Sequence, residues 1–191
     1  QQYRHQVEVD TRNLAKIVER SVSDTLTLNE LVLIALADNV ADGPTDPQAI
    51  VERTGRLVRA IKARYPKIDS LSFIDRDGRI LFRNDGPPER DYTIADRDYF
   101  IHARDGDGDG ATVFGGPHLG RISGKASLYM ARRVTDADHR FLGVVSATIL
   151  LDEIQAFLAT VDVGAEGGQR PAEEHRLVVR LLHDGAAAGA F

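Results

Sequence analysis

The stretch that decides the fold spans residues 123–151 and reads SGKASLYMARRVTDADHRFLGVVSATILL. Side chains in its first part alternate between two faces, and its last part is a long run of mainly apolar residues. Both patterns are typical of β-strands, in which successive side chains point to opposite faces of the sheet. Because the polar turn DADHR separates the two parts, the sequence predicts two long strands joined as a hairpin.

A second hairpin is predicted upstream, in IDSLSFIDRDGRILFRND at residues 68–85. Its two short apolar runs flank the turn signal RDG, which places strands at about 69–75 and 79–84. A further short strand is predicted at 112–114, where the sequence reads TVF. Clustered strands joined by hairpins predict an antiparallel sheet with helices on one side, which is an α+β architecture.

The segment before the strands has a helical pattern. No proline or glycine occurs from Tyr3 to Val40, and apolar residues recur there at helical spacing, so one long N-terminal helix is predicted. After a break, Asp46 is a suitable N-cap and Pro47 suits the first position of a second helix. This second helix is predicted to end at Tyr65, the residue before a proline.

Two shorter helices are predicted among and after the strands. Thr93 and Asp96 match a capping pattern that favours a helix from about Ile94 to Arg104. A last helix is predicted in LDEIQAFLATV, at residues 151–161. From residue 164 the composition changes to a linker-like stretch, followed by residues with the pattern of one more strand and a turn.

Composition excludes several classes of function. The chain has 191 residues, a formal net charge of −5 and no cysteine, so disulfide bonds, a thiolate nucleophile and cysteine-type zinc sites are ruled out. No basic stripe is present, and a nucleic acid is therefore not an expected partner. No stretch approaches about 18 consecutive apolar residues, the length that indicates a membrane-spanning helix.

The repeat DGDGDG at residues 105–110 begins like a calcium loop. Asp105, Asp107 and Asp109 occupy ligand positions of an EF-hand, but position 12, where a bidentate glutamate is required, is Gly116. A polar turn explains the repeat equally well, so these aspartates are metal candidates only and no cofactor is expected. The histidines lack metal-ligand spacing and no catalytic motif follows a strand, so no enzyme activity is expected in this chain.

The ordered segments IDRDGRILFRND, ADRDYF and SGKASLYMARRVTDADHRFLGVVSATI resemble the Cache sensor domains of bacterial receptors. The resemblance covers about residues 1–163. It implies a PAS-like (PDC) fold, with a long N-terminal helix and a central antiparallel sheet flanked by helices. The domains it implies are a stalk or signalling helix at 1–44, a sensor lobe at 45–163, and a linker with a vestigial or incomplete second lobe at 164–191.

The same resemblance implies a function outside the cytoplasmic membrane. The chain would be the periplasmic part of an inner-membrane receptor, with transmembrane helices outside this sequence and a kinase, cyclase or chemotaxis output. It would bind a small molecule, relay the signal through the N-terminal helix and form a homodimer through that helix. The alternative is a module of the same fold that dimerises and signals without a small molecule.

The resemblance also implies which residues contact the ligand. They lie in the short helix after the first hairpin, in a loop and in the following strand: Arg97, Tyr99, Lys125, Ser127, Tyr129 and His118. An arginine and a lysine that face one cavity favour an anion, because guanidinium binds a carboxylate through two parallel charge-assisted hydrogen bonds. A small organic acid is therefore the expected ligand.

A free amino acid is less favoured by the sequence. Members of the family that bind amino acids carry an aspartate near the end of the last strand, which holds the ammonium group of the ligand. Thr148 stands at that position here, and Tyr99 stands where a tryptophan is common. Local ion pairs of Arg97 with its neighbouring aspartates, and simple solvation of Lys125, are the competing interpretations.

Overall fold

The computed structural model describes residues 2–86, 92–106, 110–121, 123–154 and 156, with side chains from residue 20 onward. Its elements are α1 (Gln2–Ala41), α2 (Pro47–Arg64), β1 (Leu71–Asp75), β2 (Ile80–Arg83), α3 (Asp98–Asp105), β3 (Thr112–Leu119), β4 (Ala126–Thr135) and β5 (Phe141–Leu150). Residues 28–151 form one compact unit, and residues 1–27 with 152–191 are assigned to another. The predicted domain at 164–191 lies outside the described residues.

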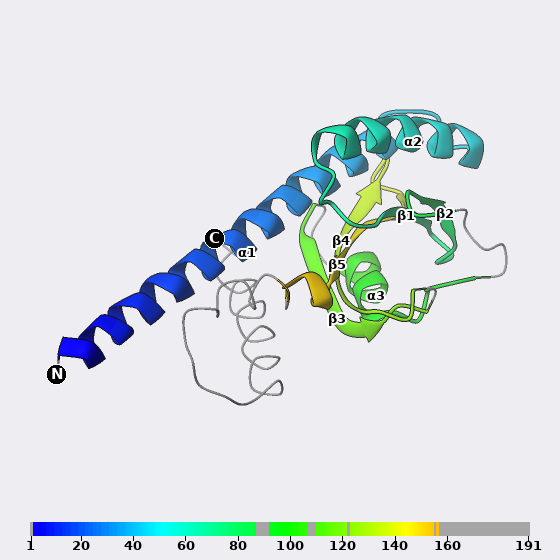
Figure 1. Ribbon diagram of the computed structural model, residues 1–191. Coiled ribbons are helices and arrows are strands. Elements are labelled where there is room, and N and C mark those ends of the chain that lie inside the picture. The colour runs from blue at the N-terminus through cyan, green and yellow to red at the C-terminus, as the bar shows by residue number, and fades with distance from the viewer. Residues whose placement is uncertain (1, 87–91, 107–109, 122, 155, 157–191) are drawn as a thin grey trace. The chain divides into compact units, whose positions relative to one another are not determined.

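The five strands form one antiparallel sheet in the order β2-β1-β5-β4-β3 (Figure 1). The two predicted hairpins are confirmed as β1–β2 and β4–β5, and β5 lies between them because it pairs with both β1 and β4. Gly143 makes the β1–β5 contact possible. Its φ of +154° and the position of the Ile74 carbonyl oxygen, with which any Cβ at residue 143 would clash, leave room only for glycine.

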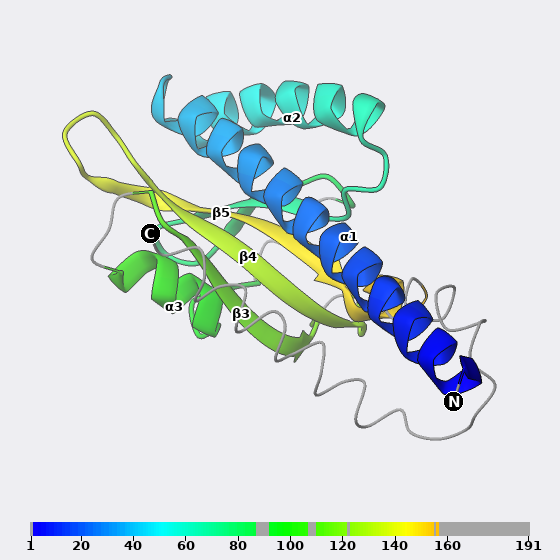
Figure 2. The same cartoon turned by 90° about the vertical axis from the view of Figure 1, so that its left-hand side faces the viewer.

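Helices cover both faces of this sheet, so the expectation of helices on one side was wrong. Within the unit at residues 28–151, α2 and the end of α1 lie over one face and α3 over the other (Figures 1 and 2). The α3 face is closed by a buried cluster that includes Ile74, Phe100, Ala131 and Val144. Apolar side chains point to opposite faces along β1 and β5, which gives each helical layer its own apolar surface.

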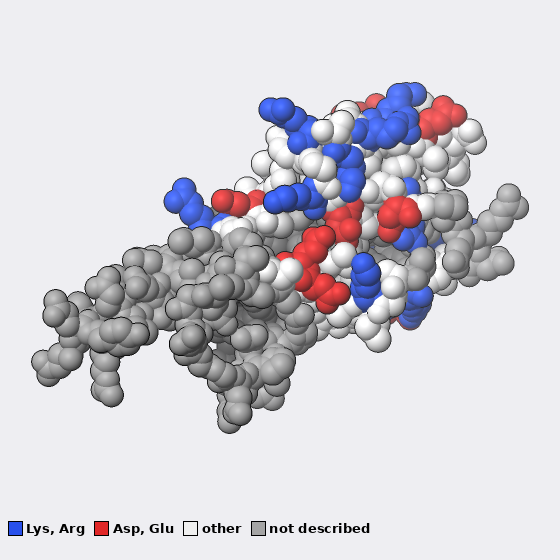
Figure 3. All heavy atoms as spheres, viewed as in Figure 1, with Lys and Arg blue, Asp and Glu red and all other residues white. Residues whose placement is uncertain are grey.

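The two N-terminal helices begin and end as predicted. The Asp46 carboxylate accepts a hydrogen bond from the Ala49 amide at 2.9 Å, and proline follows it at the first helical position. Arg53 of α2 donates to the carbonyl oxygens of Asn39 at 2.7 Å and Val40 at 3.0 Å, which satisfies acceptors left open where α1 ends. The outward side of α2 carries basic side chains, seen in blue in Figure 3.

The predicted start of α3 was wrong by four residues. The helix begins at Asp98, and the N-cap residue Arg97 makes no capping hydrogen bond with its side chain. The Thr93 hydroxyl accepts from the Ala95 amide at 3.2 Å and donates to the Gly78 carbonyl oxygen at 3.1 Å. The Thr93 hydroxyl therefore bonds the β1–β2 turn, and the predicted capping of a helix by Thr93 and Asp96 does not occur.

The third strand is longer than predicted, because it continues from TVF through the segment GGPHL. Gly115 pairs with Tyr129 of β4, and a Cβ at Gly115 would lie 2.6 Å from the Tyr99 Cβ of α3. Glycine thus lets this edge strand pass close beneath the helix. The helix predicted at 151–161 is seen in residues 151–154 and 156, and its other residues lie outside the described ones.

Candidate functional site

A cavity of about 190 Å³ opens on the face of the sheet that α3 covers. An apolar cavity of about 150 Å³ is large enough to hold benzene, so this one suits a small organic molecule. Its lining comes from β1, β2, β4, β5, the start of α3 and the loops around them. The lining residues are Asp69, Ser70, Ser72, Ile80, Arg83, Asp85, Tyr92, Ile94, Tyr99, Gly120, Arg121, Ser123, Lys125, Tyr129, Ser146, Thr148 and Leu150.

Small hydroxyl side chains form the floor of this cavity. Ser72 of β1 and Ser146 of β5 are directly opposite in the strand register, and their hydroxyl oxygens lie 2.7 Å apart. Thr148 follows two residues later on β5 and therefore points to the same face. Short side chains at these three neighbouring positions on two strands leave space where larger residues would fill the core.

Two stacked tyrosines form one wall. The rings of Tyr99 and Tyr129 are nearly parallel, with an interplanar angle of 10° and centroids 4.5 Å apart. Tyr99 is only 5% exposed, and burial raises the pKa of its hydroxyl well above its usual value. Burial also raises the pKa of Tyr129, against a lowering effect of Arg97. Both rings are therefore uncharged at neutral pH and offer a flat apolar surface with polar edges.

Three cationic side chains line the cavity. Arg83 holds Asp85 through two hydrogen bonds, Nε to Oδ1 at 2.8 Å and Nη2 to Oδ2 at 2.6 Å. Arg121 holds Asp96 in the same bidentate way, with Nη1 to Oδ1 at 3.0 Å. Lys125 is exposed, and its side chain makes no ion pair with any residue that the structure describes.

The carboxylates that pair with an arginine differ in pKa from the one that does not. Burial alone would raise the pKa of Asp85, but the hydrogen bonds and charge of Arg83 outweigh it and hold this pKa below its usual value. Hydrogen bonds from Arg121 likewise lower the pKa of Asp96. Asp69 differs, because burial and the nearby charge of Asp85 raise its pKa.

Three of the six predicted ligand contacts line the cavity, namely Tyr99, Lys125 and Tyr129. The structure places the other three elsewhere. Ser127 is fully buried and its hydroxyl donates to the Lys125 carbonyl oxygen at 3.2 Å. Arg97 donates from Nη2 to the Leu119 carbonyl oxygen at 3.0 Å, and His118 lies outside the lining.

His118 and Arg97 instead connect β3 to the start of α3. His118 Nε2 lies 2.7 Å from Asp98 Oδ1, and the same carboxylate accepts from the amides of Tyr99 at 2.7 Å and Gly116 at 3.1 Å. Burial alone would raise the pKa of Asp98, but these hydrogen bonds lower it. Both residues therefore support the helix turn that carries Tyr99.

Sequence reasoning missed Arg83, Arg121 and Asp69. The first hairpin contained a usable signal for Arg83, because it lies opposite Ser72 in the β1–β2 register and so shares its face of the sheet. Arg121 lies in the connection between β3 and β4, whose path no periodicity predicts. Asp69 directly precedes β1, at a position that reads as an ordinary polar strand boundary.

The aspartate repeat gives no metal site among the described residues. In the parts of the chain that are described, no group of three or more histidine, aspartate or glutamate side chains is arranged so that it could hold a metal ion. Asp105 pairs with Arg104, with Oδ1 2.6 Å from Nε and Oδ2 2.8 Å from Nη2. Asp107 and Asp109 lie outside the described residues, so their candidacy as ligands stays untested.

The family model of the Cache domain matches residues 1–179, which is most of the chain. The chain belongs to the Cache domain family. The α+β architecture, the long N-terminal helix and the five-stranded antiparallel sheet agree with this assignment. The domain is thus of the sensor type found in histidine kinases and chemoreceptors.

Solved structures of such domains are similar to this Cache domain. The extracellular domain of the histidine kinase rpHK1S-Z16 superposes with a TM-score of 0.70 at 26% identity, covering 84% of this chain and 64% of that one. The sensory domain of the Campylobacter jejuni chemoreceptor Tlp3 with isoleucine bound gives 0.65 at 16% identity, covering 82% and 64%. The ligand-binding domain of the Pseudomonas fluorescens chemoreceptor CtaA in complex with L-serine gives 0.61 at 15% identity, covering 85% and 66%.

The chain thus spans about two thirds or less of the length of these domains. A search of proteins with curated functions found no match. Among the described residues, no helix has the length and apolar character needed to cross a lipid bilayer.

Proposed function

We propose that this Cache domain binds a small carboxylate-bearing molecule in the cavity beneath α3, as the extracytoplasmic sensor of a membrane receptor. The observation that carries the proposal is the combination of three cationic side chains, two stacked tyrosines and a hydroxyl-lined floor around about 190 Å³. Chemoreceptor domains of the same fold hold isoleucine and L-serine, which are carboxylates of suitable size.

Lys125 and Arg121 are the proposed carboxylate-binding residues. Lys125 has no ion-pair partner among the described residues, so a ligand carboxylate would not have to displace one. The partner of Arg121, Asp96, is 62% exposed, and exposed ion pairs contribute only about 0–1 kcal/mol. Arg83 is only 12% exposed in its pair with Asp85 and is therefore a less available partner for the ligand.

The signal is proposed to leave through α1. The end of this helix, from Leu28 to Ala41, belongs to the same compact unit as the cavity, and Leu33, Leu36 and Val40 are buried there. A ligand that favours one arrangement of the sheet and loops would also bias the position of these side chains. The proposal also includes transmembrane helices, a homodimer through α1 and a kinase, cyclase or chemotaxis output. Its domains are a signalling helix at 1–44, a sensor lobe at 45–163 and a linker with a vestigial or incomplete second lobe at 164–191.

The dimer is tested by sedimentation equilibrium of the purified domain. If two chains associate through α1, the measured molar mass is expected to approach twice 21.0 kDa as the protein concentration rises. A mass of one chain at concentrations up to about 1 mM would contradict the dimer.

A thermal-shift screen against small organic acids and amino acids tests the binding proposal. At about a hundred times its dissociation constant, a ligand of the folded state adds roughly 2.7 kcal/mol to stability. For a domain of this size the melting temperature is expected to rise by roughly 5–10 °C. If no compound in a broad panel raises it, the result favours the alternative, a Cache module that dimerises and signals without a small molecule.

A further inference from the structure

Aromatic side chains are concentrated around the cavity. Three of the five tyrosines of the chain, Tyr92, Tyr99 and Tyr129, belong to its lining. The rings of Tyr99 and Tyr129 are stacked, and Tyr92 packs against the buried cluster that contains Tyr99. These rings come from three parts of the fold, namely α3, β4 and the chain before α3. Together they give the cavity an aromatic side, which the binding of a carboxylate group alone does not require.

Tyr129 stands beside short side chains on the sheet. It lies directly opposite Thr148 in the register of β4 with β5, and opposite side chains in such a pair have Cβ atoms about 5 Å apart. On the other side of β5, the Thr148 amide donates to the Ser70 carbonyl oxygen at 2.8 Å, and Ser70 also lines the cavity. Because threonine and serine are short, the space over the sheet next to the Tyr129 ring is open to the cavity.

The size of this space and its walls suit a flat ring. The cavity has about 190 Å³, and an apolar cavity of about 150 Å³ already holds benzene. Aromatic rings attract one another in offset-stacked or edge-to-face contacts beyond the gain from the area they bury. The Tyr99–Tyr129 stack, with centroids 4.5 Å apart, is one such contact within the protein. A ligand ring that enters the cavity would extend this group of rings.

Arg83 offers a second favourable surface for a ring. Its guanidinium lines the cavity and is held by both oxygens of the Asp85 carboxylate, at 2.8 Å and 2.6 Å. Its side chain is only 12% exposed in this pair, so its position is set before a ligand binds. A guanidinium packs well on the face of an aromatic ring while its edge keeps a carboxylate partner. Arg83 can therefore contact the body of the ligand without giving up Asp85.

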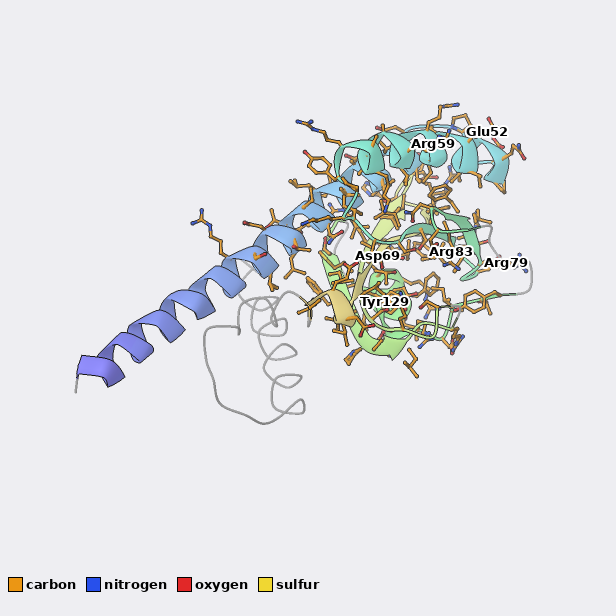
Figure 4. The ribbon with its side chains drawn as sticks, viewed as in Figure 1. Glu52, Arg59, Asp69, Arg79, Arg83 and Tyr129 are labelled. Atoms are coloured by element: carbon orange, nitrogen blue, oxygen red, sulfur yellow. The ribbon has the colours of Figure 1, made fainter. Side chains whose placement is uncertain are left out.

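We infer that the cavity selects carboxylates that carry a planar aromatic ring, with the ring packed against Tyr129. The inference rests on the proposed function, because it names the body of the same ligand whose carboxylate Lys125 and Arg121 bind. Figure 4 shows Tyr129 and Arg83 in the same part of the domain, on β4 and β2. Tyr129 is then a residue that determines specificity, since its ring attracts an aromatic ring more strongly than a saturated ring of the same size.

Matched pairs of acids test the class of ligand. Isothermal titration of the whole chain compares benzoate with cyclohexanecarboxylate, phenylacetate with cyclohexylacetate and 3-phenylpropanoate with 3-cyclohexylpropanoate. Each pair has the same charge, and burial of apolar area alone would favour the saturated member. Attraction between aromatic rings corresponds to about a two- to tenfold change in affinity. At least one aromatic acid is therefore expected to bind about threefold or more tightly than its saturated counterpart.

Variants of Tyr129 assign the preference to its ring. Tyr129→Leu is expected to remove the difference within the pair, because leucine offers apolar contact without a ring. Tyr129→Phe keeps the ring and is expected to keep the preference. Tyr65→Leu removes a tyrosine that is 46% exposed and lies outside the cavity lining, so it is the control that leaves the preference unchanged.

The outcomes separate this inference from the proposed function. Equal or tighter binding of the saturated acid in every pair, or a preference that survives Tyr129→Leu, overturns the aromatic class and leaves the proposed function standing. If Tyr129→Leu does not fold, the wild-type pairs and Tyr129→Phe decide. If no ring-bearing acid binds while an aliphatic acid of the thermal-shift panel does, only the inference fails. If no carboxylate of either set binds, the proposed function fails with it.

Discussion

Replacing both Lys125 and Arg121 with alanine is expected to weaken binding of the stabilising ligand by about a hundredfold or more. Each hydrogen bond to a charged group contributes about 1.5–3 kcal/mol, and a factor of ten corresponds to 1.4 kcal/mol. The full sum of two such bonds is not expected, because both side chains are partly open to water, where charges are screened. Isothermal titration with the best compound from the thermal-shift panel measures the loss.

A double variant of equal charge provides the matched control. Arg79→Ala with Arg140→Ala also removes two positive charges, but these arginines lie at the β1–β2 and β4–β5 turns, outside the lining, where Arg79 is labelled in Figure 4. Their pairs with Asp77 at 3.9 Å and Asp136 at 2.7 Å are exposed on the arginine side. Wild-type affinity in the cavity variant, or an equal loss in the control, would show that the cavity cations do not bind the ligand.

Replacing Phe100 with alanine is expected to lower the free energy of unfolding by about 3–5 kcal/mol, the usual cost of removing a large aromatic side chain from a core. Phe100 is 0% exposed and packs in the cluster that joins α3 to the sheet. Its helix neighbour Tyr99 forms the cavity wall, so loosening of α3 would also weaken ligand binding. Urea denaturation of the unliganded domain gives the stability change.

Leu119→Ala is the control for the core variant. Leu119 is 68% exposed, so its truncation is expected to change stability by no more than about 0.5 kcal/mol. If Phe100→Ala and Leu119→Ala had similar small effects, the packing of α3 against the sheet would not be the core that the structure shows.

Local patterns were sufficient to predict most of the fold. Helical periodicity without proline or glycine gave α1, the aspartate–proline start gave α2, and turn signals between apolar runs gave both hairpins. The errors lie where tertiary contacts decide. The hydroxyl of Thr93 donates a hydrogen bond to the β1–β2 turn, and α3 begins later than predicted. At Gly115 the chain passes close to Tyr99, and β3 continues beyond the predicted end. Neither partner is near in sequence, so no local pattern contains the information.

The candidate site was predictable only in part for the same reason. Tyr99, Lys125 and Tyr129 followed from the family resemblance, and the structure places all three around the cavity. Arg83 enters it through the register of β1 with β2, in which it lies opposite Ser72, and Asp69 lies just before β1. Single-sequence reasoning assigned the carboxylate-binding role to Arg97, whose guanidinium instead bonds the Leu119 carbonyl oxygen.

The most direct test of the central claim is a crystal structure of the domain with the most stabilising compound of the panel. The account predicts that the compound occupies the cavity between the stacked Tyr99–Tyr129 wall and the Ser72–Ser146 floor. Its carboxylate is expected within about 3.2 Å of Lys125 Nζ or an Arg121 nitrogen. A ligand bound elsewhere on the domain, with this cavity filled by protein side chains, would contradict the account.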